Sequence, residues 1–231
     1  MLHEEARPED ESLSCALMLV ANAASYRAAM THCANLVAVH RGHGGAAPGR
    51  RDQEISINRA IVVMTVAAWQ AAVQEMTETA VVAGQPPAGS PLANYYNLVA
   101  GQVRNEIGRF STPNMENTRR LMQGAGFDPY PHWTWSQNGG QGVGVITITP
   151  HTAATRVAEW LRVRHDIAHG HATISHVDVL QAVRAPAIRP AGWHPTIRLV
   201  DAEQCMAFFR RLCQLTASAL GAQLGQPAGT W

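Results

Sequence analysis

The sequence contains no lysine, so its 18 cationic side chains other than histidine are all arginines. This absence excludes Schiff-base catalysis and the lysine of a P-loop, because both need a primary amine. Arginine stays charged and can bind phosphate through two donors at once, so any phosphate contact here is expected to be of that kind. Charged residues are also scarce, at 15%, whereas 46% of the residues are hydrophobic, a balance that argues against disorder.

The few charges are unevenly distributed. Residues 1–11 hold five acids and one arginine, which leaves 17 arginines against 12 acids, a net charge of +5, in the rest of the chain. We expect this acidic segment to be a disordered tail. The formal net charge of +1 predicts no strong general attraction to nucleic acid or membranes. A mildly basic body is nevertheless compatible with a polyanionic partner.

Cysteine is rare as well, and no two cysteines form a C-x-x-C pair. Each of the four lies in an apolar helical pattern: Cys15, Cys33, Cys205 and Cys213. This predicts buried free thiols in a reducing compartment. The acidic N-terminus differs from a secretory signal, and the longest apolar run, residues 61–73, is too short to span a bilayer. We therefore expect a cytoplasmic protein.

The periodicity of apolar residues predicts an all-α protein. Helices are expected at 12–39, from 52 or 56 to about 82, at 91–109 and 114–124, from about 152 to 170, from 175 to about 183, and at 202–221. Residues 127–150 interrupt this pattern with a loop rich in proline and glycine, in which residues 143–149 alternate like a short strand. We expect one helical domain, residues 12–221, and a C-terminal tail, residues 222–231.

Histidines are concentrated in one short stretch. Four of the 11 fall within 12 residues: His165, His169, His171 and His176. The chain also has three Arg-x4-His pairs: Arg27/His32, Arg164/His169 and Arg189/His194. Only the middle pair lies at the end of a predicted helix, where Gly170 favours a left-handed cap. A helix C-terminus favours an imidazolium, and Arg164 adds a fixed positive charge beside it. Proton transfer beside a phosphate-binding cation is what metal-free phosphodiester cleavage needs.

The wider pattern Arg-polar-x-aliphatic-Ala-His-Gly, residues 164–170, resembles the HEPN superfamily. Ribonucleases of that superfamily carry Arg-x4-6-His with a polar residue after the arginine. Arg164 and His169 match the two ends of this motif, and His165 stands in the polar place. The ending Ile-Ala-His-Gly is similar to the RiboL-PSP group of HEPN domains, as are the apolar helix around Trp69 and the segment 117–133. The resemblance covers roughly residues 55–221 and implies a HEPN-like helical bundle.

The resemblance implies a metal-independent endoribonuclease that needs no cofactor. The 2′-hydroxyl of RNA would attack the adjacent phosphate and leave a 2′,3′-cyclic phosphate and a 5′-hydroxyl. His169 would act as general base or acid, Arg164 would stabilise the charge on phosphorus, and His165 would orient or assist. Because the reaction needs both a base and an acid, a homodimer that joins two motifs is expected. HEPN relatives often act as toxins or in antiviral defence, so an antitoxin or other regulatory protein is an expected partner.

Other side chains are candidates for binding the RNA substrate. They are the cationic or titratable neighbours of the motif and an arginine pair upstream: Arg162, His171, Arg119 and Arg120. Trp133 and Trp135 could stack on bases, but aromatic residues in a proline-rich segment more often anchor the loop on the core. We therefore expect these two tryptophans to be buried.

Zinc binding is the first alternative. His165-Asp-Ile-Ala-His169 differs by one residue type from the His-Glu-x-x-His of zinc peptidases, and its two histidines would share a helix face. Asp166 would be one methylene too short as the base, and His171 or His176 would have to supply the third ligand. This alternative predicts a zinc-binding protein or hydrolase.

A non-catalytic protein is the second alternative. The same Arg and His side chains would then satisfy the carbonyls and charges of a helix end, or serve a HEPN-like module that only binds RNA or a protein. The residues that would bind phosphate are the same in the enzyme and in the binding module. Only loss of cleavage on mutation separates the two.

Overall fold

The computed structural model describes residues 8–42, 51–139, 144–185 and 187–231. Within these ranges the chain forms seven α-helices, a two-stranded hairpin and a short 3-10 helix, η1 (Tyr130–His132), which confirms the predicted fold class. The helices are α1 (Pro8–Gly42), α2 (Arg51–Ala83), α3 (Ala93–Arg109), α4 (Met115–Gly124), α5 (Pro150–Ala168), α6 (Gln181–Arg184) and α7 (Leu199–Leu224). The strands are β1 (Trp135–Asn138) and β2 (Val145–Ile148).

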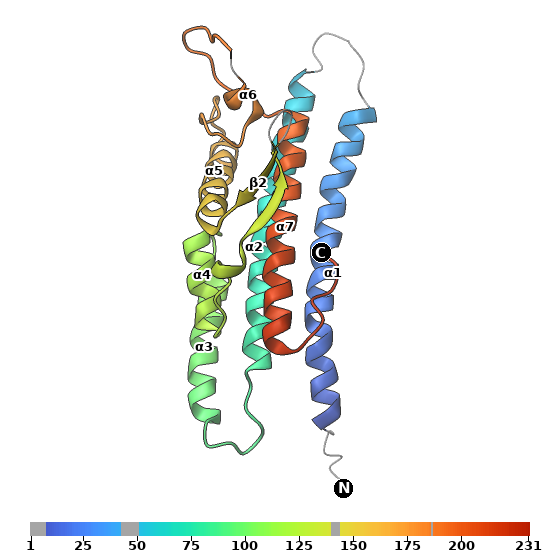
Figure 1. Ribbon diagram of the computed structural model, residues 1–231, viewed down its shortest axis with the longest axis vertical. Helices are drawn as coiled ribbons and strands as arrows, with labels where there is room; N and C mark the ends of the chain where they lie inside the picture. Colours follow the sequence, from blue (N-terminus) through green and yellow to red (C-terminus); the bar gives the residue numbers. More distant parts are fainter. Residues whose placement is uncertain (1–7, 43–50, 140–143, 186) are drawn as a thin grey trace.

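The long helix α2 is the centre of the bundle. It packs against α1, α5 and α7, and α3 and α4 adjoin its C-terminal half (Figure 1). Its fully buried side chains include Ile61, Trp69 and Met76, and the Trp69 indole donates a hydrogen bond to the carbonyl oxygen of Pro113 at 3.1 Å. By length and composition alone, residues 52–83 would suffice to cross a membrane. The expected apolar run is therefore part of a longer apolar helix, and the cytoplasmic location stays a prediction.

Short polar side chains set the ends of the helices around the histidine stretch. The Asn114 side chain accepts from the backbone N–H of Asn117 at 2.7 Å and so begins α4, as predicted. Thr149 caps α5 in the same way. Helix α7 begins at Leu199 rather than at residue 202, because Asp201 lies inside its first turn and accepts from the N–H of Arg198.

The helix predicted from residue 175 to 183 is wrong over residues 175–180, since α6 begins only at Gln181. Carboxylates from other elements take the backbone donors of this segment. Ser175 N–H donates to Asp166 at 2.8 Å, Val179 N–H to Glu159 at 3.0 Å, and Gln181 N–H to Asp201 at 2.6 Å. Donors that are engaged in this way cannot form the hydrogen bonds of a helix.

The interruption at residues 127–150 contains the hairpin. Strand β2 lies within the predicted 143–149, whereas β1 was not predicted; residue 143 lies outside the described residues. The strands are antiparallel, with Trp135 opposite Ile148. Both tryptophans are buried as expected, and the Trp133 indole donates to the Thr216 hydroxyl at 2.9 Å. Trp133 is fully buried and therefore has no face on which a base can stack.

The two chain ends differ from the expected tails. Helix α1 begins at Pro8, so residues 8–11 are helical, and residues 1–7 lie outside the described part. At the other end the chain returns to α1, where Trp231 packs against Tyr26 with ring centroids 5.6 Å apart (Figure 1). Three of the cysteines, at positions 33, 205 and 213, are buried and free as predicted; the side chain of Cys15 lies outside the described part.

Candidate active site

The last two turns of α5 present a basic, exposed face. His165 and His169 follow Arg162 by three and seven residues. With about 100° of rotation per residue, the three positions fall within about 60° around the helix axis. All three side chains are exposed. The opposite face carries Val157 and Trp160, which are buried in the core and fix the rotation of the helix. Burial of one face therefore directs the other toward solvent.

Three imidazoles gather at this helix end. The ring centroids of His165 and His169 are 4.1 Å apart, and His171 lies 6.0 Å from the first and 6.1 Å from the second. Gly170 brings His171 back, because its φ of +67° reverses the chain. The N–H of His171 then donates to the carbonyl oxygen of Asp166 at 2.9 Å, and that of Gly170 to Ile167 at 3.1 Å, which is the Schellman end of a helix.

Asp166 holds the third imidazole in place. Its side chain is buried and accepts from the backbone N–H of Ser175, and its other oxygen lies 3.1 Å from Nδ1 of His171. Burial alone would raise the pKa of Asp166, but the hydrogen bonds from Ser175 and His171 outweigh it and lower this pKa below its ordinary value. Asp166 is thus a buried carboxylate that fixes Nδ1 of His171 and leaves Nε2 on the other edge of the ring.

Sequence reasoning missed this role of Asp166 and considered the residue only as the base of a zinc peptidase. A signal was present, since Asp166 follows the apolar Val163 by one helical turn and so falls on the inner side of the helix. A carboxylate in that position needs hydrogen-bond donors close by. The returning segment 171–175 supplies them.

Arg164 lies on a different side of α5 from the imidazoles. Five residues separate it from His169, which corresponds to about 140° around the helix. It is half-buried, on the side of Trp160, and makes no hydrogen bond or ion pair with the residues that the structure describes. Arg162 is the arginine that shares the face of His165 and His169. The predicted pair is therefore close in sequence but not aligned on one face.

The upstream arginine pair is engaged elsewhere. The Arg119 guanidinium bonds Asp128 at 2.6 Å and lies over the Tyr130 ring, 4.7 Å from its centroid. Arg120 donates to the Asn117 side chain at 3.0 Å. These two candidates for RNA binding are therefore part of a local network around η1.

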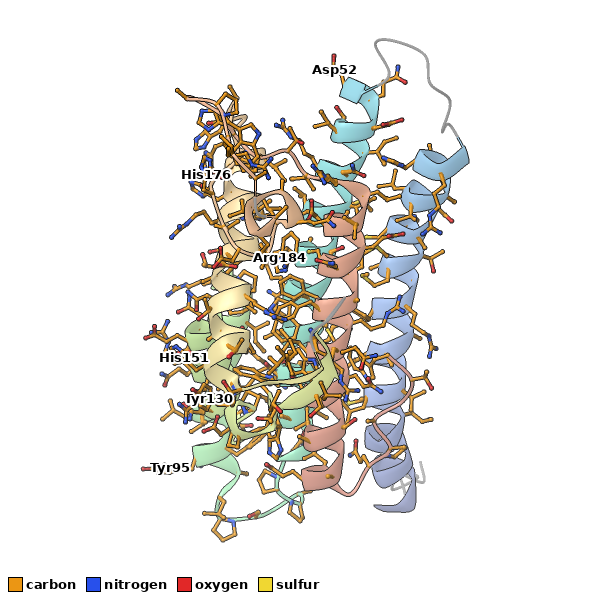
Figure 2. All side chains as sticks on the ribbon, turned by 45° about the horizontal axis from the view of Figure 1, so that its top comes forward. Asp52, Tyr95, Tyr130, His151, His176 and Arg184 are labelled. Carbon is orange, nitrogen blue, oxygen red and sulfur yellow. The ribbon has the colours of Figure 1, made fainter. Side chains whose placement is uncertain are left out.

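The same pair is far from the imidazoles. Tyr130 lies near His151 at the start of α5, whereas His176, which follows the end of α5 in the chain, lies well apart from both (Figure 2). Fourteen residues separate His151 from His165, a rise of about 21 Å along the helix. An RNA would reach both regions only if it extended over several nucleotides.

The fourth histidine of the stretch belongs to another group. His176 packs against the rings of Trp193 and His194, at centroid distances of 5.5 and 5.6 Å. The guanidinium of Arg189 lies over the Trp193 ring, 4.4 Å from its centroid. Across the described ranges, no three His, Cys, Asp or Glu side chains are arranged to hold a metal ion. His165 and His169 share a face as the zinc alternative requires, but His176 does not join them.

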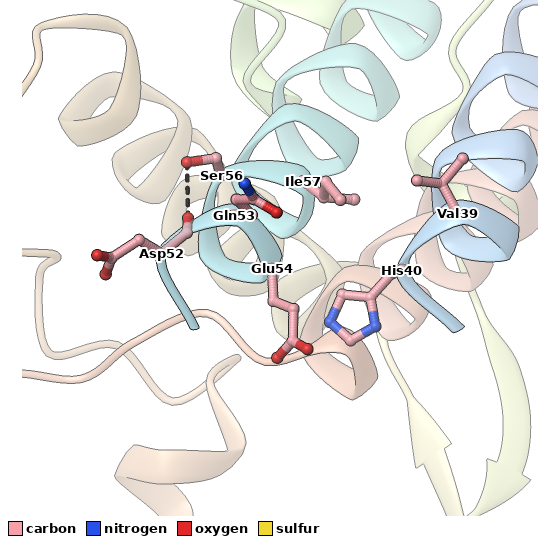
Figure 3. A pocket seen from close by; sticks show the side chains of 7 residues that line it. All are labelled: Val39, His40, Asp52, Gln53, Glu54, Ser56 and Ile57. Atoms are coloured by element: carbon pink, nitrogen blue, oxygen red, sulfur yellow. Dashed lines mark hydrogen bonds between the residues drawn. The ribbon is translucent and has the colours of Figure 1, made fainter. Parts of the chain in front are cut away.

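A cavity of about 450 Å³ lies between the end of α1 and the start of α2, and its described lining includes none of the three imidazoles (Figure 3). Its lining includes His40, Asp52 and Glu54, and the Ser56 hydroxyl donates to the carbonyl oxygen of Asp52 at 2.8 Å. The titratable side chains there make no cluster comparable to that at the end of α5.

Comparison with protein-family models, curated proteins and solved structures finds no match to this chain. The HEPN resemblance therefore remains a prediction that rests on the motif residues. The function has to be argued from the site itself.

Proposed function

We propose that the protein is a metal-independent endoribonuclease whose active site is the imidazole cluster at the end of α5. The observation that carries this proposal is the group of three exposed imidazoles, within 4.1 to 6.1 Å of one another, beside Arg162. Histidine is the side chain best suited to give and take protons near neutral pH. Arginine binds phosphate through two donors. The cluster thus offers both requirements of phosphodiester cleavage on one accessible surface.

The reaction moves two protons. A base removes the proton of the RNA 2′-hydroxyl as its oxygen attacks the adjacent phosphorus, and an acid protonates the departing 5′-oxygen. His165 and His169 are the closest pair and can divide these two tasks. His171, fixed by Asp166, is the positioned neighbour that orients this pair or the phosphate. The products are a 2′,3′-cyclic phosphate and a 5′-hydroxyl, and the need for a 2′-hydroxyl restricts the substrate to RNA.

Both arginines of the helix end have a place in this proposal. Arg162 lies on the imidazole face, where its guanidinium can bind the scissile or a flanking phosphate. Arg164 has no hydrogen-bond partner among the described residues and can stabilise charge from the adjoining side. Alanine substitutions at the two positions show which one acts on the reaction.

The rates of cleavage test the proposal. Labelled single-stranded RNA is incubated in excess EDTA with the wild type and with His165→Ala, His169→Ala, Arg162→Ala and Arg164→Ala. Loss of either histidine is expected to slow cleavage about 10²- to 10⁴-fold, the usual contribution of general acid–base catalysis. His151→Ala is the matched control, because this histidine is exposed on the same helix at its other end. Activity that returns only with added zinc would contradict the proposal and favour the zinc alternative.

We also propose that the protein forms a homodimer. Proton transfer alone does not require the second chain, since one chain supplies several imidazoles. Mixing the two variants that are expected to be inactive, His165→Ala and His169→Ala, distinguishes the two arrangements. A site shared between chains would regain activity in the mixture, whereas a site within one chain would not. An antitoxin or regulatory partner is a further proposal, which growth arrest on expression of the wild type but not of His169→Ala would support.

A further inference from the structure

A second cavity, of about 630 Å³, lies among β1, α5, α6 and α7. Three arginines line it, one from each helix: Arg156, Arg184 and Arg211. Its described lining contains no aspartate or glutamate. In Figure 2, Arg184 lies between His151 and His176. Arg156 is nine residues before His165, so it lies about 13 Å away along α5 and on the opposite face. This cavity is therefore distinct from the imidazole cluster.

Two of these arginines, Arg156 and Arg184, are close enough for their charges to repel each other. Burial first, and the charge of Arg184 second, lower the pKa of Arg156. Arg156 makes no hydrogen bond within the described part of the chain. The nearby Glu159 offsets only part of this repulsion, and its Oε2 already accepts from the N–H of Val179. The protein therefore holds close cations together at the cost of their mutual repulsion.

The other arginines are held in position. Arg184 donates to the carbonyl oxygen of Asp178 at 3.0 Å and to the Gln204 side chain at 2.9 Å. Arg211 donates to the Gln214 side chain at 2.9 Å. Each guanidinium has five N–H donors, so these bonds leave several free for a ligand. Fixing a side chain before a ligand binds lowers the entropy lost on binding.

The remaining lining is mostly aromatic, aliphatic and amide in character. Trp135, Trp160 and Phe208 are its aromatic members, and the rings of Trp135 and Phe208 lie 5.9 Å apart. Gln137 and Asn138 add neutral hydrogen-bonding groups from β1. A pocket with apolar walls, a few polar groups and a volume of several hundred Å³ is typical of small-molecule sites.

We propose that this cavity binds a small ligand that carries two or more linked phosphate groups. Three arginines match a ligand with several negative charges, and their planar guanidinium groups bind phosphate oxygens in pairs. Free oligophosphate and a nucleoside polyphosphate share this chemistry. The aromatic and amide side chains of the lining could contact a nucleoside, so they would favour a nucleoside polyphosphate over free oligophosphate. The proposal does not depend on the proposed ribonuclease function.

Isothermal titration calorimetry with tripolyphosphate, at about 0.15 M salt to screen non-specific attraction, tests this directly. Saturable binding of one ligand per chain is expected. Arg156→Gln and Arg211→Gln should each weaken it by about tenfold or more, the equivalent of one charge-assisted contact. Arg210→Gln is the matched control, because it is the exposed neighbour of Arg211 in α7 and does not line the cavity. Adenosine triphosphate in a parallel titration shows whether a nucleoside adds affinity.

Thermal unfolding supplies the second readout. Without ligand, Arg156→Gln should unfold at or above the temperature of the wild type, because the change removes a repulsion and keeps the size of the side chain. At one fixed concentration, tripolyphosphate should then raise the unfolding temperature of the wild type by more than that of this variant. Absence of saturable binding to the folded wild type would overturn the proposal, as would equal weakening by Arg210→Gln. Binding of an RNA oligonucleotide that depends on Arg156, without binding of tripolyphosphate, would overturn it in favour of an RNA groove.

Discussion

Replacing Asp166 by asparagine should destabilise the protein and displace one imidazole of the cluster. Asp166 is 6% exposed as a residue. One of its carboxylate oxygens accepts from the N–H of Ser175 at 2.8 Å, and the other lies 3.1 Å from the ring of His171. Asparagine keeps the shape but has a single acceptor oxygen and no charge. One of the two hydrogen bonds is therefore lost. The amide nitrogen of asparagine would then face either the N–H of Ser175 or the ring of His171, and in the second case the imidazole would have to turn.

The magnitude follows from the kind of bond that is removed. A hydrogen bond to a charged group contributes about 1.5 to 3 kcal/mol to stability. The His171 side chain is half-exposed, so the ion pair itself adds less than about 1 kcal/mol. We expect the free energy of unfolding of Asp166→Asn to fall by about 2 kcal/mol, mostly through the contact with Ser175 and the loop that it holds.

Urea denaturation at pH 7 measures this loss, with Asp178→Asn as control because Asp178 is an exposed aspartate of the same loop. The pKa of Asp166 is lowered in the folded protein, so its contribution is complete above the pKa of the unfolded chain. It disappears as the pH falls through the folded value. The difference between wild type and Asp166→Asn should therefore be constant near neutrality and shrink below about pH 4. A change equal to that of Asp178→Asn, or one that does not depend on pH, would refute the reasoning.

Three further substitutions test other parts of the account. Trp133→Phe removes the indole donor from the buried Thr216 hydroxyl and should lower the free energy of unfolding by about 1 to 3 kcal/mol in urea denaturation; an unchanged midpoint would contradict this. Gly170→Ala should lower the free energy of unfolding by about 1 to 2 kcal/mol, because the φ of +67° is unfavourable for alanine. The added Cβ would meet no atom within 4 Å, so a larger loss would contradict this account. Arg119→Ala breaks a solvent-exposed pair with Asp128, so it should leave both the urea midpoint and the cleavage of short RNA nearly unchanged. A slower cleavage rate would place this arginine at the reaction.

The sequence was sufficient to predict those elements whose structure is decided locally. The apolar pattern of α2 and the Asn114 cap of α4 depend on residues within a few turns, and both were predicted close to their observed ends. Strand β1 was missed because its four residues become a strand only through pairing with β2. Residues 175–180 were wrongly predicted as helix because the carboxylates that bind the backbone of this segment come from α5 and α7, which local sequence does not reveal.

The candidate site shows the same division. The four histidines are close in the sequence, and helical spacing predicts that His165 and His169 share one face, which agrees with their ring distance of 4.1 Å. Whether His171 or His176 joins them depends on the turn at Gly170 and on the packing of Trp193, which spacing does not determine. The angle between Arg164 and His169 follows from their five-residue spacing on a helix, so the sequence alone indicates it, whereas the side of the helix that faces solvent depends on the burial of Trp160.

The chemical ends of the cleavage products test the central claim most directly. A short end-labelled RNA and a DNA of the same sequence are incubated with the protein in EDTA, and the products are analysed by mass spectrometry. The account predicts that RNA alone is cut, with 2′,3′-cyclic phosphate and 5′-hydroxyl ends, and that His165→Ala and His169→Ala abolish these products. Cleavage of DNA at the same rate, products with 5′-phosphate ends, or full activity in both histidine variants would contradict it.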